Sequence, residues 1–229
     1  MDDPGEDFPV DRARELRAGG TQVVPRPAAW EPGPAAPWPV GARVSLDHLL
    51  SVVPDRAGPI LPAFPEARHS AVLVTLAEGD DGPEVLLTRR SWDMRHHRGE
   101  VSFPGGRMDP GESPSETALR EANEEVGLEP SVVTIQGELT HLNTVVSNSY
   151  IVPKVATVDS RPVLAPRTME VERVLWVPLA ELTRPDTYSA ERWGLDGTTR
   201  VLHFFHLDDE TVWGATAHIL VDLLSRATA

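Results

Sequence analysis

Residues 105–128, GGRMDPGESPSETALREANEEVGL, contain the clearest local signals in the chain. Their pattern predicts a helix over 114–126. Ser113 is placed to cap the first turn, the proline after it suits the first helical position, and Glu116 completes a capping box. Gly127 can adopt the left-handed conformation that ends a helix. The stretch therefore predicts a glycine-containing loop that leads into a short, well-capped helix.

Three carboxylates share one face of this predicted helix. With Glu121 at 0° and about 100° per residue, Glu125 lies at about 40° and Glu124 at about −60°. Ala118 and Ala122 lie on the neighbouring arc, where small side chains allow close packing against a sheet. From the helix alone two interpretations stay open: a solvated acidic surface, or a site for a hard divalent cation, which prefers oxygen ligands.

The sequence just before the glycines is basic. Between residues 89 and 98 there are four arginines and two histidines, with Asp93 as the acidic exception. Guanidinium groups bind phosphate oxygens through paired hydrogen bonds. The stretch is either a set of solvated loop charges or a phosphate contact. Its place between a predicted strand and the carboxylate helix favours substrate binding by Arg89, Arg90 and Arg95.

The remaining apolar runs predict an α+β fold, in which helices pack against a mixed β-sheet. We expect three parts: a proline-rich, flexible extension over 1–40, an N-terminal helix and linker over 41–69 that pack on the domain, and a compact domain over 70–229. Strand-like runs fall at 71–76, 85–88, 101–103, 132–135, 150–158, 171–177 and 200–207, and further helical runs at 44–53 and 215–226.

Composition narrows the classes of partner. The formal net charge of −14 argues against general binding to nucleic acid or anionic membranes. Cysteine is absent, which removes thiolate metal sites and thiol catalysis. No apolar run approaches the ~20 residues that cross a bilayer, and the acidic start lacks the apolar stretch of a secretory leader. We expect a cytoplasmic protein, monomeric or homodimeric, that holds an anionic small molecule with a basic patch or a metal ion.

The pattern Gly106-x5-Glu112-x7-Arg120-Glu121-Ala122-x-Glu124-Glu125-x-Gly127-Leu128 resembles the signature of the Nudix hydrolases. The resemblance implies an α/β/α sandwich that hydrolyses a nucleoside diphosphate linked to another moiety, with Mg²⁺ or Mn²⁺ as cofactor. Ala122 departs from the pattern, which usually has a larger aliphatic residue there. The residues implied are Glu121, Glu124 and Glu125 as metal ligands, Glu124, Arg120 and Glu121 as catalytic residues, Glu112 as an orienting carboxylate, and Gly105 and Gly106 beside the substrate.

The identity of the general base stays open among these glutamates. Members of the family also recruit a carboxylate outside the helix. Glu100, Glu170 and Glu172 are the candidates, each weighed against a structural or solvated role.

A second motif narrows the resemblance. Leu86-Leu87-Thr88-Arg89-Arg90-Ser91-x3-Arg95-x3-Gly99-x3-Phe103-Pro104-Gly105-Gly106 is similar to the motif of the coenzyme A pyrophosphatases, with Gly99 and Phe103 in supporting positions. It implies cleavage of CoA or acyl-CoA to 3′,5′-ADP and (acyl-)4′-phosphopantetheine. The alternatives are another diphosphate substrate (ADP-ribose, NADH or a nucleoside triphosphate) and a non-catalytic nucleotide-binding domain. Residues 144–150 lack the glycine of that group's Ser-Gly-aromatic run, which bears on substrate preference.

Overall fold

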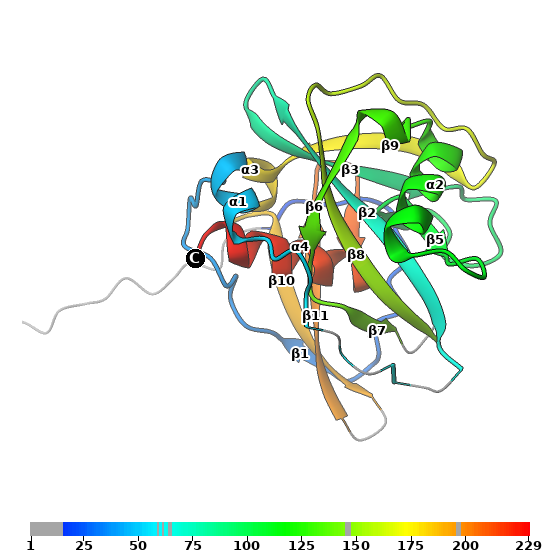
Figure 1. The fold of residues 1–229 in the computed structure, drawn as a ribbon. Helices are drawn as coiled ribbons and strands as arrows, with labels where there is room; N and C mark the ends of the chain where they lie inside the picture. Colours follow the sequence, from blue (N-terminus) through cyan, green and yellow to red (C-terminus); the bar gives the residue numbers. More distant parts are fainter. Residues whose placement is uncertain (1–15, 59, 61, 64–65, 145–147, 196–197) are drawn as a thin grey trace, which may run out of the picture.

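The computed structural model describes residues 16–58, 60, 62–63, 66–144, 148–195 and 198–229. Two β-sheets and four α-helices make up the fold over these residues (Figure 1). The strands are β1 Trp30–Pro32, β2 Arg68–Gly79, β3 Gly82–Arg90, β4 Val101–Ser102, β5 Gly105–Arg107, β6 Val133–Glu138, β7 Leu142–Thr144, β8 Ser149–Val158, β9 Val171–Pro178, β10 Tyr188–Leu195, β11 Thr198–His206 and β12 Thr211–Trp213. The helices are α1 Leu46–Val52, α2 Pro114–Val126, η1 Pro130–Val132 (a 3-10 turn), α3 Leu179–Leu182 and α4 Gly214–Ala227.

The larger sheet has the order β4-β3-β2-β8-β6, with β5 on β2, β7 on β8 and β9 on β3. Among the described strands, β2 and β8 form its parallel pair, with Ala71 opposite Val152. The other pairs in this sheet are antiparallel, so the predicted mixed sheet is confirmed. α2 lies in the connection from β2 to β8, which carries it to one face of the sheet.

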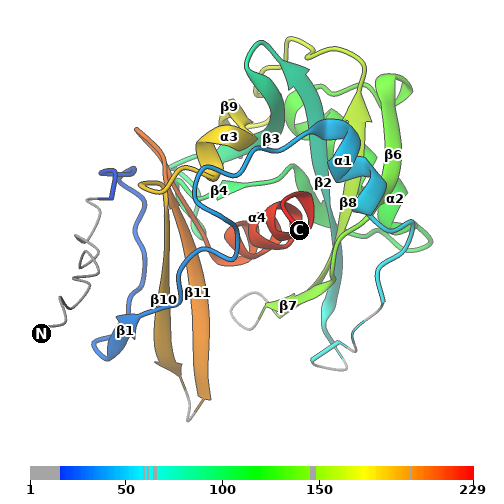
Figure 2. The ribbon, with the colours of Figure 1, turned by 90° about the vertical axis from the view of Figure 1, so that its left-hand side faces the viewer.

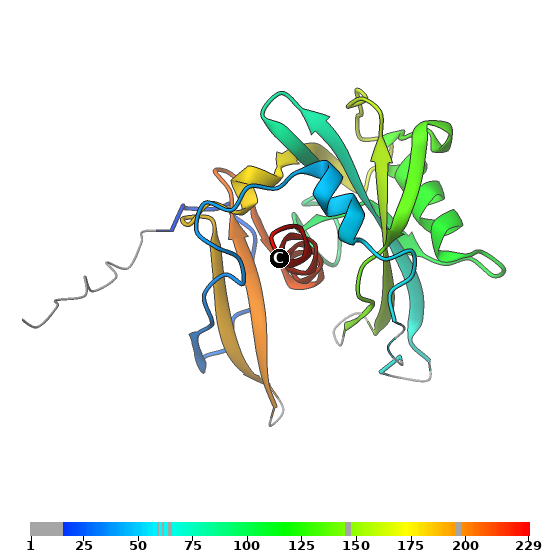
Figure 3. The same ribbon diagram turned by 60° about the vertical axis from the view of Figure 1, so that its left-hand side comes forward.

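Two large clusters of buried apolar side chains fill the spaces between the helices and the sheets. One lies between α2 and the large sheet, and the other between that sheet, α1, α4 and the smaller sheet. Figure 3 shows α4 end-on between the two sheets, with α2 on the far side of the larger one. The helix–sheet–helix order implied by the resemblance is present, and the smaller sheet adds a layer outside α4. No helix in the described part of the chain is long and apolar enough to cross a membrane.

The smaller sheet has the order β1-β10-β11-β12 and stands to one side of α4 (Figure 2). Alternation predicts β11 from residues 200–207, whereas β10 carries Glu191 and Arg192 in mid-strand and gives little apolar signal. β1 pairs with β10 through Trp30 opposite Trp193. Its proline is tolerated because β1 is an edge strand.

Residues 16–40, which we expected to be flexible, lie against the smaller sheet. Trp38 is buried at 6% exposure and contacts Tyr188 edge-on and Phe205 face-on, with ring centroids 5.1 and 6.1 Å apart. Proline prevents regular helix here but does not prevent docking through aromatic side chains. The first fifteen residues of the expected extension lie outside the described residues.

Candidate functional site

α2 begins and ends where its capping signals predict. The Ser113 Oγ accepts a hydrogen bond from the Glu116 N–H at 3.3 Å, and the Glu116 carboxylate accepts one from the Ser113 N–H at 2.8 Å. Gly127 ends the helix with φ at 77°. The two alanines expected to face the sheet are fully buried against it. The helix is therefore fixed close to β2, which determines where its carboxylates can reach.

Arg120 connects the carboxylates of α2 to the loop before it. Its Nε donates to Glu112 at 2.7 Å, and its Nη1 donates to Glu121 at 2.9 Å and to Glu124 at 3.1 Å. Its Nη2 donates to the carbonyl of Arg107 at 3.1 Å. One guanidinium thus holds three carboxylates and a loop carbonyl, which requires the planar, five-donor fork of arginine.

Glu112 is committed to the loop. The Arg120 guanidinium, together with hydrogen bonds from the Asp109 N–H at 2.9 Å and the Thr117 hydroxyl at 2.7 Å, lowers the pKa of Glu112 to about 2. The group therefore stays ionised near neutral pH. With its oxygens occupied by these donors, Glu112 orients the loop and Arg120.

Glu125 is the most deeply placed carboxylate of the three, at 8% exposure. Burial, with a smaller effect from neighbouring Glu121, raises the pKa of Glu125 to about 7, although the Gly105 N–H donates to it at 3.3 Å. Burial also raises the pKa of Glu121. Glu124 is the open member, with 55% of its side chain exposed. The three carboxylates thus form a gradient from buried to exposed along one helix face.

Gly105 and Gly106 bring the backbone of β5 against these carboxylates. Gly105 has φ at 155°, and a Cβ there would overlap the carbonyl oxygen of Ala71 on β2. A Cβ on Gly106 would overlap the carboxylate of Glu121. Side chains at either position would separate β5 from β2 or from α2, so the sequence Gly-Gly is required by this close approach.

The donor set of α2 fits a hard divalent cation. Carboxylate oxygens are the ligands that Mg²⁺ and Mn²⁺ prefer, and burial, which raises the pKa of both Glu121 and Glu125, disfavours their ionised forms in the absence of a bound cation. As the side chains stand, no three His, Asp or Glu groups within the described ranges converge closely enough to hold a metal ion. Arg120 holds Glu121 and Glu124, so ligation would require these two carboxylates to turn from the guanidinium.

The arginines predicted to bind substrate are placed differently from one another. Arg89 pairs with Glu210 at 2.7 Å and with Glu172 at 3.2 Å. Arg90 pairs with Glu170 at 3.1 Å. Arg95 is exposed and has no ion-pair partner among the described residues. Phosphate binding by all three stays a prediction, and Arg95 is the one whose charge is not already paired.

The three candidate carboxylates outside the helix also differ in their contacts. Glu170 lies close enough to raise the pKa of Glu125 and is held by Arg90. Glu172 pairs with Arg89, and Glu100 hydrogen-bonds to the His97 ring at 2.9 Å. Among these three, Glu170 is therefore the carboxylate whose charge acts on Glu125.

The two supporting positions have structural explanations. Gly99 has φ at 63°, and the Trp92 ring packs so closely that a Cβ on Gly99 would overlap it. Phe103 is 3% exposed within the core between the sheets, so it is not placed to stack on a nucleotide base. Residues 145–147, in the segment without the expected glycine, lie outside the described residues.

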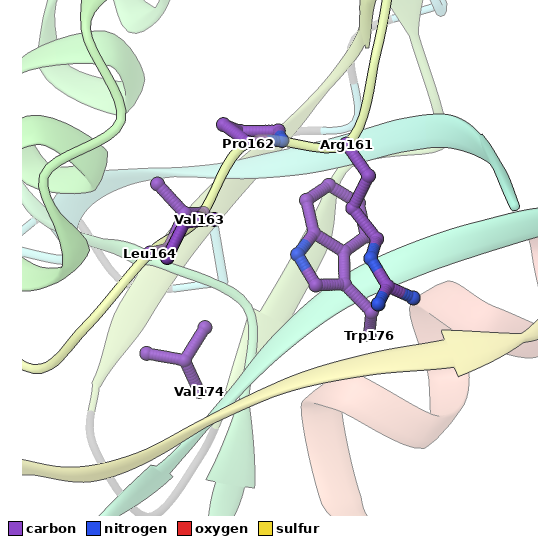
Figure 4. A pocket seen from close by; sticks show the side chains of 6 residues that line it. All are labelled: Arg161, Pro162, Val163, Leu164, Val174 and Trp176. Carbon is purple, nitrogen blue, oxygen red and sulfur yellow. The ribbon is translucent and has the colours of Figure 1, made fainter.

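A cavity of about 310 Å³ lies beside β9 (Figure 4). Trp176 forms one wall, and its buried indole N–H has no hydrogen-bond partner among the described residues. Arg161, held by Glu84 at 2.7 Å, lies at the same cavity. No carboxylate is among the residues that line it, and it lies apart from the predicted site residues of α2.

Sequence reasoning missed the groups that hold the arginines. Glu210 is fully buried and pairs with both Arg89 and Arg173. Gln22 reaches the same carboxylate from the N-terminal segment. No local pattern marks either residue, because the contacts join positions more than 100 residues apart along the chain.

The chain is similar in sequence to proteins of one known family. The family described as NUDIX domain matches residues 67–195, more than half of the chain. Nudix hydrolase 3 of Caenorhabditis elegans is 40% identical over 139 residues, covering 59% of this chain and 58% of that protein. Nudix hydrolase 15, mitochondrial, of Arabidopsis thaliana is 34% identical over 184 residues, covering 75% and 60%. The chain thus spans less than two thirds of the length of these two relatives.

A bacterial relative is matched over more of its length. The Nudix hydrolase NudL of Photorhabdus laumondii is 37% identical over 158 residues, covering 68% of this chain and 83% of that protein. Among solved structures, the Nudix hydrolase RenU of M. smegmatis aligns with a TM-score of 0.44 at 22% identity, covering 51% of this chain and 73% of RenU.

Proposed function

Because the chain belongs to the Nudix family, we propose that it hydrolyses the pyrophosphate bond of coenzyme A or an acyl-CoA, giving 3′,5′-ADP and (acyl-)4′-phosphopantetheine. The observation that carries the hydrolytic part is the face of α2, where Glu125 and Glu121 lie beside the Gly105–Gly106 backbone and Arg120 joins Glu121 to Glu124. The CoA part is supported by the motif that runs from Leu86 to Gly106.

The residues of this face have distinct tasks in such a reaction. Mg²⁺ or Mn²⁺, held by Glu121, Glu124 and Glu125, would withdraw charge from the diphosphate and orient the attacking water. Arg120 holds Glu121 and Glu124 while no metal is bound, and both carboxylates would turn from the guanidinium to bind it. A carboxylate of this group accepts the proton of the attacking water. Burial raises the pKa of Glu125 to about 7 in the metal-free protein, so metal binding to Glu125 would release its proton at lower pH.

The negative charge of the substrate must be balanced by positive groups within the binding site. A chain of net charge −14 repels a CoA-like anion at long range. The arginine loop, defined as residues 91–100 between β3 and β4, carries the exposed Arg95, which has no ion-pair partner among the described residues, and the charge of Arg90 just before the loop acts on Glu125. Arg95 is therefore the side chain best suited to contact a substrate phosphate.

A second substrate class has one observation in its favour. The run Thr144–Tyr150 lacks the glycine that the CoA group usually has. If this run contacts the group attached to the diphosphate, preference shifts to another nucleoside diphosphate derivative such as ADP-ribose or NADH.

The experiment is a panel of diphosphates with products identified by mass. CoA, acetyl-CoA, ADP-ribose, NADH and a nucleoside triphosphate are incubated with Mg²⁺ or Mn²⁺, and in parallel with EDTA. We expect CoA to give 3′,5′-ADP only when metal is present, and the Glu121→Gln variant to be inactive. Turnover of another diphosphate with CoA inert would contradict the CoA assignment, and inertness of all would contradict hydrolysis.

A further inference from the structure

A segment outside the matched family region contacts the arginine loop. Residues 17–22, here called the N-terminal strap, precede that region by more than forty residues. The side-chain amide of Gln22 donates to the carbonyl of Gly99 at 3.1 Å and also donates to Glu210. Its side-chain oxygen accepts from the N–H of Thr211 at 2.8 Å. One side chain thus joins the strap, the arginine loop and the start of β12.

Glu210 explains why this contact is specific. Its carboxylate is fully buried, accepts from Arg89 at 2.7 Å and from Arg173 at 3.0 Å, and takes its third donor from Gln22. A buried charge is tolerated only when paired and hydrogen-bonded. Removal of Gln22 therefore leaves an oxygen of a buried carboxylate without one of its donors and disturbs the group that holds Arg89.

The strap is itself fixed along its length. The Gly20 N–H donates to the Thr211 hydroxyl at 3.0 Å, and Gly19, with φ at 69°, lies so close to that hydroxyl that a Cβ would overlap it. The Arg17 N–H donates to the Asp186 carbonyl at 3.0 Å, and its guanidinium pairs with Glu181. Gln22 is consequently presented to Gly99 from a fixed backbone.

Gly99 is the position through which the strap can act on the loop. Its left-handed conformation turns the chain toward β4, and Trp92, from the other end of the loop, packs on it. Within the loop, Arg98 Nε donates to the Met94 carbonyl at 2.7 Å, which closes the turn that carries Arg95. Holding the Gly99 carbonyl thus holds both ends of the segment that presents Arg95.

We propose that Gln22 is a positioning residue for substrate binding, which fixes Arg89 and the arginine loop so that Arg95 meets the phosphates of the substrate. This inference rests on the proposed hydrolysis of a diphosphate. Because Gln22 touches no reacting group, its effect falls on KM and not on kcat.

The test compares Gln22→Ala and Gln22→Glu with Gln136→Ala. Gln22→Glu keeps the acceptor for Thr211 but loses the donor to Gly99 and places a second carboxylate against Glu210. Gln136, the other glutamine of the chain, donates to Thr157 on β8 and serves as the matched control. We expect both Gln22 variants to raise KM about five- to tenfold, as the loss of one or two hydrogen bonds implies, with kcat within about twofold. Gln22→Glu should be at least as impaired as Gln22→Ala, and Gln136→Ala should match the wild type.

A second readout does not depend on activity. Trypsin cleaves after exposed arginines, and Arg95 and Arg98 are both exposed in the loop. Limited proteolysis followed by mass analysis should show faster cleavage at these two sites in the Gln22 variants than in Gln136→Ala, with each variant digested at the same interval below its own melting temperature. Three results would overturn the proposal: faster cleavage with an unchanged KM, an unchanged cleavage rate, or a Gln22→Glu variant with the KM of the wild type. If the wild type hydrolyses no diphosphate, the proposed function fails, while the cleavage rates still report whether the strap holds the loop.

Discussion

The carboxylate of Glu125 lies 3.3 Å from the backbone nitrogen of Gly105, and this hydrogen bond joins the buried end of the α2 face to the first residue of β5. This hydrogen bond stabilises the ionised carboxylate by less than burial destabilises it, because the pKa of Glu125 still rises to about 7. A protein that keeps an ionisable group in this condition gives up stability at that position. The predictions below follow from that relationship and from its neighbours.

Glu125→Gln should stabilise the metal-free protein at high pH and abolish metal-dependent hydrolysis. The folded state keeps the Glu125 proton up to about pH 7, whereas the unfolded chain releases it near 4.5. Stability of the metal-free wild type should therefore fall as pH rises from 4.5 through 7, by up to about 3 kcal/mol. Thermal melts in EDTA at pH 5 and pH 8 measure this. Equal pH slopes for the variant and the wild type would contradict it.

Arg120→Lys should reduce turnover far more than the retained charge would suggest. Lysine cannot bond Glu112, Glu121 and Glu124 at once, since it is a point charge without a planar fork. We expect kcat/KM to fall at least about tenfold and stability to fall by on the order of 1–2 kcal/mol. Arg161→Lys, at a pair with the buried Glu84 away from α2, is the control and should leave kcat/KM unchanged.

Alanine at the two adjacent glycines should separate folding from activity. At Gly106 the added methyl meets the end of the Glu121 side chain, which can move. We expect a folded protein that melts within a few degrees of the wild type but has lost most of its activity. At Gly105 the methyl meets the Ala71 carbonyl in a strained backbone, and we expect a loss of about 2–4 kcal/mol in stability. Urea denaturation and activity assays distinguish the two, and equal effects on both properties would contradict the assignment.

Arg95→Ala should raise KM and flatten its salt dependence. An exposed arginine attracts an anionic substrate through a screened interaction, so the KM of the wild type should rise between ~20 and ~200 mM salt. The variant should start from a higher KM and change less. Arg167→Ala, at an exposed pair with Glu129, provides a charge-matched control. A KM for the wild type that does not change with salt would rule out this role of the loop.

Local patterns predicted the parts of the molecule that are local in structure. α2, its capping box and its glycine end follow from a few neighbouring residues, and the strand-like apolar run over 150–158 corresponds to β8. The pairing of strands that lie far apart in the sequence could not be predicted from such local patterns. The smaller sheet depends on β1 meeting β10 across about 160 residues, and no residue of β1 indicates that partner.

The same distinction applies to the candidate site. The carboxylates of α2 could be identified because they repeat at helical spacing. The pairing of Arg89 with Glu210 could not, because a buried carboxylate in an acidic loop looks like any solvated one in sequence. The surface that residues 16–40 lie against could not be predicted for a related reason, since proline excludes regular structure without indicating what the chain packs on.

The parallel pairing of β2 with β8 sets an order of assembly. It closes a segment on the order of eighty residues, and long-range closure of this kind is a slow step in folding. α2 lies inside that segment and packs on both β2 and β8, so its set of sheet neighbours is complete only once these strands have met. Mutations that weaken the β2–β8 pairing should therefore lower the yield of competent molecules while each molecule that matures keeps its full turnover.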